Sequence, residues 1–335
     1  MTEARRYFRY HFQKSVPKLI LELMMVLVVL LLIPKSYVEE EIIVTELMLA
    51  GIMIAIIMPS QEFSEFHNRR NLDTWFSLPI DRMKLGLVHY LNGALQIGAV
   101  LAFMAVGILF RLKANTIKNY GMYALLCFTV LAMCLLLYGL LCLAFTCANT
   151  SADGSTFVLA YLILPLAINL AVLSAAMHFE WMEESIDSFA IGMPVCLFTM
   201  RTGFANAIVG DGNALSEVFH DSWFVSRLVL NILICAAATV MMLFNFRNCH
   251  AEKVEDISDS WFGYRTLLPI YALCAAFFTY TYAGSVLLGI VLIICYMGYR
   301  RSSKLHKSDW AVIAVYFLVS LLVCGRAGRL PDMIP

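Results

Sequence analysis

Charged residues are scarce in this sequence. Only 14% of its 335 residues are Asp, Glu, Lys or Arg, and 61% are hydrophobic, whereas about a quarter of a typical soluble domain is charged. The apolar residues gather in blocks, many of them close to the roughly 20 residues that an α-helix needs to cross a bilayer. The composition therefore predicts an all-α polytopic membrane protein. The formal net charge is zero, which argues against a nucleic-acid partner.

Motifs that carry catalysis are also missing. The sequence has no G-x-x-x-x-G-K-[ST] loop to hold ATP phosphates, no H-E-x-x-H pair and no G-x-S-x-G turn. Most of the ten cysteines lie inside apolar blocks, and no pair has the spacing of a zinc ribbon. We therefore predict no catalytic residues, no metal site and no cofactor in this chain. An intramembrane enzyme is the least favoured function.

The apolar blocks predict nine membrane spans. A basic and aromatic segment, residues 1–16, precedes the first of them and is expected to form an interfacial helix on the membrane surface, with a disordered leader as the alternative. No small-residue cleavage site follows the first apolar block, which is therefore expected to remain as a span. The spans are expected at about 17–33, 42–58, 84–110, 122–147, 156–177, 226–246, 266–282, 285–299 and 310–324.

Lysine and arginine set the expected orientation, because cytoplasmic loops are enriched in them. With the N-terminus in the cytoplasm and nine alternating spans, most of the 24 Lys and Arg residues fall on the cytoplasmic side. The basic loop at 111–121 argues weakly for the opposite orientation. We therefore expect a multi-pass protein of the plasma membrane with a cytoplasmic N-terminus and an extracytoplasmic C-terminus.

Residues 178–225 do not follow the pattern of the spans. The apolar run at 189–200 is too short to cross a bilayer and is expected to be re-entrant or interfacial. The residues that follow it are expected to form a loop with a turn at 210–213.

The longest polar interruption in the first half of the chain is the segment 59–84. A helix at about 61–75 is expected there, and its mixture of acids, bases and aromatics indicates a docking surface for a partner. Pro79 is expected to end the local structure, and Asp81 is expected to cap the next span. The alternative is a solvated loop with ordinary cytoplasmic charges.

Charged side chains inside the predicted spans are few, which lowers the odds of an ion-coupled carrier or a proton relay. Uncharged polar residues do occur there. Asn92 and Gln96 lie four positions apart on one face of the span at 84–110, and Asn169 lies in the span at 156–177. They are candidates for a weakly polar translocation path. Hydrogen bonding between helices is the favoured alternative for each of them.

The segment 59–84 also resembles part of a known family. Glu62 and Glu65 are followed by the motif Phe76-Ser77-Leu78-Pro79-Ile80-Asp81-Arg82, which leads into a span. This order is similar to that of ABC-2 type transporter permeases, in which an acidic helix after the second span precedes a leucine-serine-leucine-proline-like motif. The similarity covers about residues 1–250.

The resemblance implies an organisation for the whole chain. After the interfacial helix, residues 17–250 would form a six-span ABC-2 type core, in which 59–84 is a cytoplasmic coupling segment and 178–225 an outer re-entrant region. Residues 251–335 would add about three transmembrane helices, a hairpin and a last span, which depart from the six-span plan.

The resemblance further implies that the chain is the transmembrane subunit of an ATP-driven ABC transporter, with export as its direction. A separate cytoplasmic ATPase would bind ATP and magnesium and dock on the coupling segment. The other expected partners are membrane lipid and a second permease chain, identical or different. The docking residues that the resemblance implies are Glu62, Glu65, Phe66, Arg69, Arg70, Asp73, Trp75, Leu78, Pro79, Asp81 and Arg82.

A function of another class stays open. The outer segment at 178–225 would bind a ligand or an envelope partner if the protein were a non-transporting membrane sensor or an envelope-assembly scaffold. A neighbouring gene for an ATPase with a phosphate-binding loop favours the transporter. A neighbouring kinase or envelope-synthesis gene alone favours the alternative.

Overall fold

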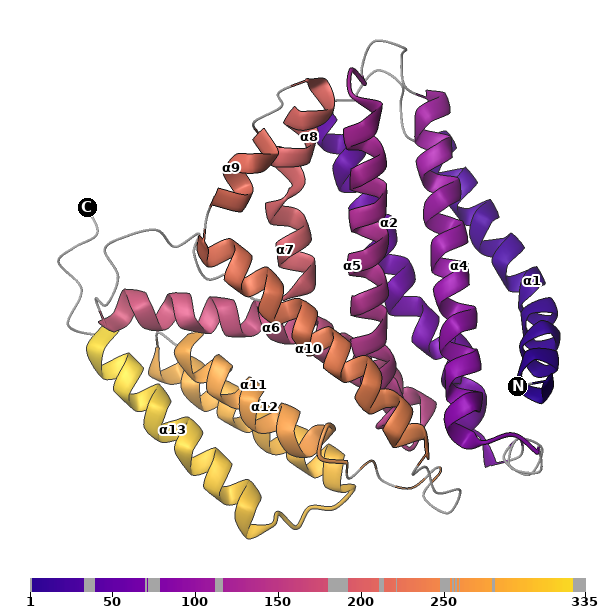
Figure 1. Cartoon of the computed structure of the whole chain (residues 1–335). Helices are drawn as coiled ribbons and strands as arrows, with labels where there is room; N and C mark the ends of the chain where they lie inside the picture. The colour runs from indigo at the N-terminus through magenta and orange to yellow at the C-terminus, as the bar shows by residue number, and fades with distance from the viewer. Residues whose placement is uncertain are drawn as a thin grey trace. The chain divides into compact units, whose positions relative to one another are not determined.

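The computed structural model describes residues 2–32, 40–69, 71, 79–111, 117–179, 192–210, 214–220, 222–247, 254, 256, 258, 260–278 and 281–327 (Figure 1). All regular structure in these residues is helical. The longer helices are α1 (Thr2–Leu32), α2 (Glu40–Phe63), α4 (Arg82–Arg111), α5 (Tyr120–Thr146), α6 (Ser151–Phe179), α10 (Ser222–Arg247), α11 (Tyr264–Phe278), α12 (Tyr282–Arg300) and α13 (Lys307–Ala327). The short ones are η2 (Ser64–His67), α7 (Met193–Thr199), α8 (Arg201–Val209) and α9 (Ala214–His220).

Seven of the described helices are long and apolar enough to cross a membrane, namely α2, α4, α5, α6, α10, α12 and α13. The prediction of an all-α multi-pass membrane protein is confirmed at this level. The other two predicted spans fall in α1 and α11, and α11 is a shorter apolar helix. The number of crossings and the sides on which the termini lie therefore stay predictions.

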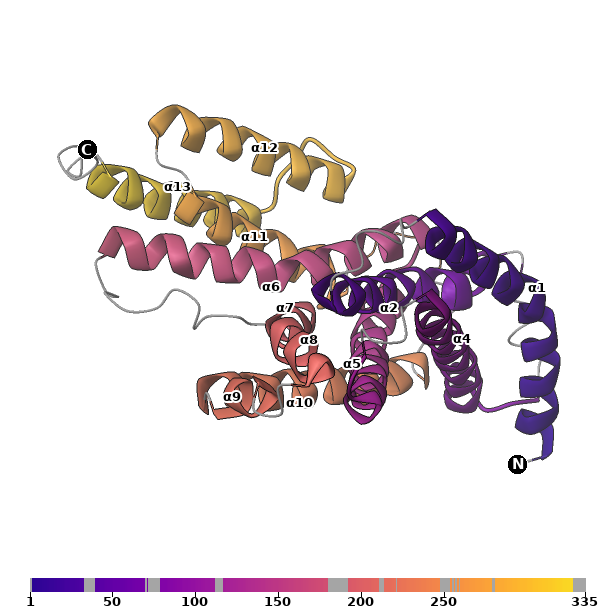
Figure 2. The ribbon, with the colours of Figure 1, turned by 90° about the horizontal axis from the view of Figure 1, so that it is seen from above.

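Helix α1 is continuous from Thr2 to Leu32 and contains Pro17. The expected interfacial helix at 1–16 and the expected span at 17–33 are therefore parts of one continuous helix. A helix can continue through a proline where neighbouring groups satisfy the freed carbonyl. Helix α1 packs along α4, which lies between α1 and α5 (Figure 2).

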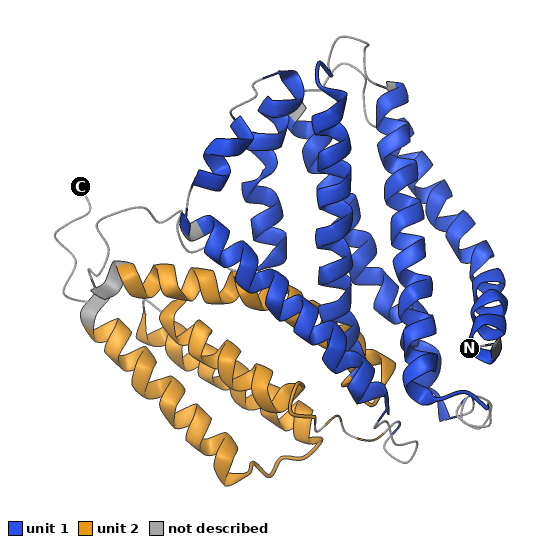
Figure 3. Cartoon of the chain, in the orientation of Figure 1, with its two compact units in different colours: residues 1–146, 192–254 blue, residues 147–191, 255–335 orange. Residues whose placement is uncertain are grey.

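The chain divides into two compact units (Figure 3). Unit 1 is Met1–Thr146 with Gly192–Val254, and unit 2 is Cys147–Ile191 with Glu255–Pro335. The expected boundary near residue 250 lies close to the end of unit 1. However, α6, which was expected inside a six-span core at 17–250, groups with α11, α12 and α13 instead.

In unit 1, α5 packs against both α2 and α10. Two glycines allow these helices to approach closely. A Cβ at Gly51 of α2 would overlap the Cys134 side chain of α5, and a Cβ at Gly139 of α5 would overlap the Thr239 side chain of α10. Without an aqueous hydrophobic effect between them, helices in a membrane depend on such close packing for their association.

The short helices of unit 1 correct one expectation. Residues 203–223 were expected to be loop-like, but 203–209 belong to α8 and 214–220 form α9. The expected turn is confirmed at its first residue, because α8 ends at Val209 and the next residue, Gly210, caps it with a φ of 119°, a conformation that glycine adopts readily. Helices α7 and α8 contact α2 and α5.

In unit 2, polar side chains join α6 to the residues that lead into α11. The Asp153 carboxylate accepts hydrogen bonds from Ser258 Oγ at 2.7 Å and from Tyr264 Oη at 2.9 Å. Further along, Tyr271 Oη donates to the Ala160 carbonyl at 2.6 Å. Each bond satisfies a polar group that would otherwise be costly to hold among apolar helices.

Candidate functional site at the junction of three helices

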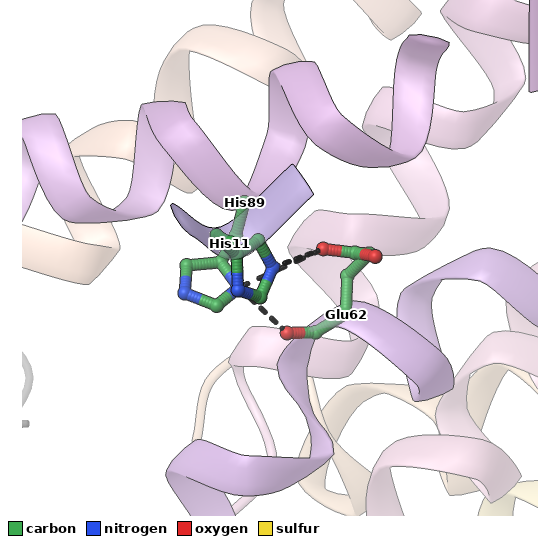
Figure 4. A group of neighbouring side chains, drawn as sticks. All are labelled: His11, Glu62 and His89. Atoms are coloured by element: carbon green, nitrogen blue, oxygen red, sulfur yellow. Dashed lines mark hydrogen bonds and ion pairs between the residues drawn. The ribbon is translucent and has the colours of Figure 1, made fainter. Parts of the chain in front are cut away.

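A buried polar cluster lies where α1, α2 and α4 meet in unit 1 (Figure 4). Its centre is Glu62 in the last turn of α2, flanked by His11 of α1 and His89 of α4. The exposed fractions of these residues are 6% for His11, 2% for Glu62 and 0% for His89. Ionisable groups are rarely buried this deeply unless they are paired.

The Glu62 carboxylate has hydrogen-bond donors at both oxygens. Its Oε2 accepts from His11 Nε2 at 2.9 Å. Its Oε1 accepts from the side-chain amides of Asn92 at 2.9 Å and Gln96 at 2.7 Å. These donors offset the large free energy of removing a carboxylate from water.

His89 is held at both ring nitrogens. Its Nδ1 lies 3.0 Å from the Glu62 carbonyl oxygen and 3.7 Å from Glu62 Oε2. Because a carbonyl only accepts, His89 Nδ1 is the donor, and in the neutral ring Nε2 accepts from Tyr7 Oη at 3.0 Å. Burial, with a smaller effect of the Glu65 and Glu62 carboxylates, raises the pKa of the Tyr7 phenol. Tyr7 therefore keeps its proton near neutral pH.

Other contacts fasten α1 to its neighbours around the same centre. Ser15 Oγ donates to the His11 carbonyl at 3.0 Å and accepts from Asn92 Nδ2 at 2.8 Å. At the exposed edge, Lys14 Nζ lies 2.9 Å from Glu65 Oε1. The cluster thus joins an N-terminal helix, the end of α2 and the first half of α4.

Three buried side-chain atoms of the cluster have no hydrogen-bond partner among the described residues. They are the outer ring nitrogen of His11 and two amide oxygens: His11 Nδ1, Asn92 Oδ1 and Gln96 Oε1. A buried polar atom without a partner costs free energy, and such atoms in a native protein often mark a site for water or an ion.

The expected helix at 61–75 is helical in most of its described part but is interrupted at Asn68. Helix α2 ends at Phe63, η2 covers Ser64–His67, Asn68 is extended with φ −113° and ψ 116°, and Arg69 and Asn71 are again helical. The side chains of Glu62 and Phe66 are buried inside the chain, so neither is available to a partner's surface. Phe66 packs edge-on against His89 and Phe246, with ring centroids 4.8 Å away in both cases.

The remaining docking candidates have different positions. Glu65 is partly exposed beside Lys14, and Arg69 Nε donates to the Val254 carbonyl at 2.9 Å. Pro79 and Arg82 are exposed. The predicted cap of α4 is confirmed, because Asp81 Oδ1 accepts from the Met83 backbone at 3.4 Å. Four candidates lie outside the described residues: Arg70, Asp73, Trp75 and Leu78.

The candidates for a translocation path separate into two places. Asn92 and Gln96 are buried and donate to Glu62, which supports the alternative of hydrogen bonding between helices. Asn169 belongs to α6 of unit 2 and is half-buried.

The sequence reasoning missed His11, His89, Tyr7 and Ser15. A signal for part of this set was present, because His89, Asn92 and Gln96 recur at helical spacing along one face of an apolar span. The low number of charged residues in the predicted spans argues against a proton relay or an ion-coupled carrier, but it does not exclude one buried cluster. The sequence predicts Glu62 in a separate docking helix at 61–75, whereas α2 continues to Phe63 and carries it inward.

Comparison with models of known protein families finds no match for the chain. Comparisons with curated proteins and with solved structures find no match either.

Proposed function

We propose that this chain is the membrane subunit of an ATP-driven transporter and that a separate cytoplasmic ATPase docks on it. The resemblance of residues 59–98 to ABC-2 type permeases motivates the proposal. The observation that carries it is the hydrogen-bonded position of Glu62. Glu62 lies in the last turn of α2, within the segment 59–84. At this point its carboxylate also accepts hydrogen bonds from α1 and α4.

This arrangement suits the transmission of a motion. When the ATPases close on ATP, the segment 59–84 is pushed, and the Glu62 cluster passes the push to three helices rather than one. Motions of packed helices as rigid bodies are a common way in which proteins convert a local change into a larger one. Two such chains with two ATPase subunits would form the working unit, and export is the proposed direction.

The proposed docking surface consists of the exposed or partly exposed candidates, with Glu62 and Phe66 behind it as transmitting residues. Arg82 is an exposed cation at the start of α4. Glu65 lies in η2, and Arg69 lies just beyond η2. Arg70, Asp73, Trp75 and Leu78 stay proposed members of this surface. Exposed charges of this kind set partner specificity and association rate.

The test is purification of the chain from its native membrane with mass spectrometry of the proteins that accompany it. We expect an ATPase with a G-x-x-x-x-G-K-[ST] loop at a ratio of one to one. Arg82→Glu is expected to weaken this association. Lys304→Glu is the matched control, because Lys304 is an exposed cation between α12 and α13.

Absence of such an ATPase from the purified complex contradicts the transporter proposal. Recovery of an envelope-synthesis enzyme or a kinase in its place would favour the scaffold or sensor instead. Equal loss of the ATPase in the Arg82 and Lys304 variants would contradict docking on the segment 59–84.

A further inference from the structure

We propose that His11, Glu62 and His89 bind a divalent transition-metal ion of the Zn²⁺ type. Each residue offers one ligand atom, and the three atoms all lie within 4.8 Å of one another. Two imidazoles and a carboxylate form a ligand set that Zn²⁺ and its neighbours in the first transition row accept. The side chains come from three different helices and converge on one another (Figure 4).

The separations of the inward-facing atoms fit such an ion. Glu62 Oε2 lies 2.9 Å from His11 Nε2 and 3.7 Å from His89 Nδ1. Ligand atoms of a tetrahedral ion with bonds of about 2.0–2.1 Å are roughly 3.3 Å apart. These two separations lie on either side of this value, and all three ligand atoms lie within 4.8 Å of one another. Side-chain shifts on the order of an ångström would therefore seat the ion.

The ligand side chains also have hydrogen-bond partners on the atoms that face away from the proposed ion. In many metal sites such partners orient the ligands. Asn92 and Gln96 both donate to Glu62 Oε1, which leaves Oε2 directed at the imidazoles. Tyr7 Oη contacts His89 Nε2 at 3.0 Å. Tyr7, Asn92 and Gln96 would therefore be the outer shell of the site.

Metal binding requires both rings to present a lone pair inward. His89 Nδ1 would give up its hydrogen bond to the Glu62 carbonyl, and the ring proton would be carried on Nε2, where Tyr7 Oη can accept it. His11 would likewise change tautomer, so that its ring proton moves from Nε2 to Nδ1 and Nε2 presents its lone pair to the ion. No net change of charge is needed on either neutral ring.

Two buried acceptors support an occupied site. Asn92 Oδ1 and Gln96 Oε1 have no partner among the described residues, although the other atoms of both amides are used. Three protein ligands leave one position of a tetrahedral ion for water. Such a water could also donate a hydrogen bond to a buried acceptor beside the site.

The test is titration of the purified full chain with Co²⁺. The protein is purified with a tag that contains no histidine and is first stripped of metal with a chelator. We expect one Co²⁺ per chain with the strong visible absorption of a tetrahedral ion, displaced by Zn²⁺. Glu62→Gln is expected to weaken Co²⁺ binding by more than tenfold, because it removes a ligand. The control is the double variant His220→Ala, His306→Ala, since both imidazoles are exposed and outside the cluster.

A second variant allows the proposal to be tested even if Glu62→Gln does not fold. Tyr7→Phe keeps all three ligands and is expected to weaken Co²⁺ binding by about tenfold through the outer shell. Stoichiometric binding that is lost only in the His220, His306 control would overturn the proposal. So would the absence of bound Co²⁺ in the wild type. If Glu62→Gln does not elute as a folded protein, unchanged affinity in Tyr7→Phe overturns it. These measurements use the isolated chain, so they are independent of the transport proposal.

Discussion

His11 Nε2 lies 2.9 Å from Glu62 Oε2, and this contact joins residues that are 51 positions apart in the chain. Both side chains are buried. The contact therefore fixes the N-terminal helix to the end of α2 in a place where water does not compete. It also means that the polar surface expected around Glu62 faces the inside of unit 1.

Removal of the Glu62 carboxylate is expected to destabilise the protein strongly. Glu62→Ala leaves His11, Asn92 and Gln96 buried without their acceptor, and loss of one partner from a buried charged network costs about 3–5 kcal/mol. The measurement is the midpoint of thermal unfolding in detergent. Glu62→Gln keeps the shape and one acceptor oxygen, so it is expected to lose less. Equal midpoints for Glu62→Ala and the wild type would contradict the network's role.

Gly93 is expected to tolerate no side chain. A Cβ there would overlap the phenol of Tyr138 and lie 3.2 Å from Glu62 Cγ. Overpacking of this kind costs about 1–3 kcal/mol. Gly98→Ala is the matched control on the same helix, because its new Cβ would have only a contact of 4.0 Å with Leu131. We expect Gly93→Ala to lower the unfolding midpoint while Gly98→Ala leaves it unchanged or raises it.

Asp153 is expected to be important for unit 2. Asp153→Ala removes the acceptor of Ser258 and Tyr264 together. Ser258 is buried, and a buried polar group left without its partner costs about 1–3 kcal/mol. Tyr264→Phe removes only one of the two bonds and is expected to cost less. Limited proteolysis of the protein in detergent would compare the two variants. Faster cleavage in Tyr264→Phe than in Asp153→Ala would contradict this order.

Asp81 is expected to stabilise the first turn of α4. Its carboxylate accepts from the Met83 backbone, and replacement of an N-cap by alanine costs about 0.5–2 kcal/mol. Asp81→Asn keeps a capping oxygen and serves as the control. Hydrogen exchange of the amides at 83–85 is expected to speed up in Asp81→Ala alone. Equal exchange in both variants would indicate that the cap contributes little.

The helices could be predicted from the sequence because each predicted span is a long apolar block, and apolar length alone indicates a helix in a membrane. The cap at Asp81 and the turn at Gly210 could be predicted for a similar reason, since both depend on residues next to each other in the chain. The grouping of α6 with α11 to α13 could not, because it is decided by contacts between distant segments.

The candidate site could be predicted only in part. Glu62, Asn92 and Gln96 were singled out, but as members of two separate surfaces. Their meeting depends on where α2 ends and on how α1 packs along α4, and neither is a local property. His11 looked like part of a basic surface segment, because nothing near it in sequence indicates that its ring is buried.

The Glu62 cluster also sets an order of assembly during synthesis. Glu62 takes its donors from both directions of the chain: His11 precedes it, whereas the ring of His89 and the amide of Gln96 come 27 and 34 positions later. Until α4 has been made, the carboxylate has only His11 as a partner within the cluster. The hydrogen bonds around the Glu62 carboxylate can therefore be completed only after α4 has joined the first two helices.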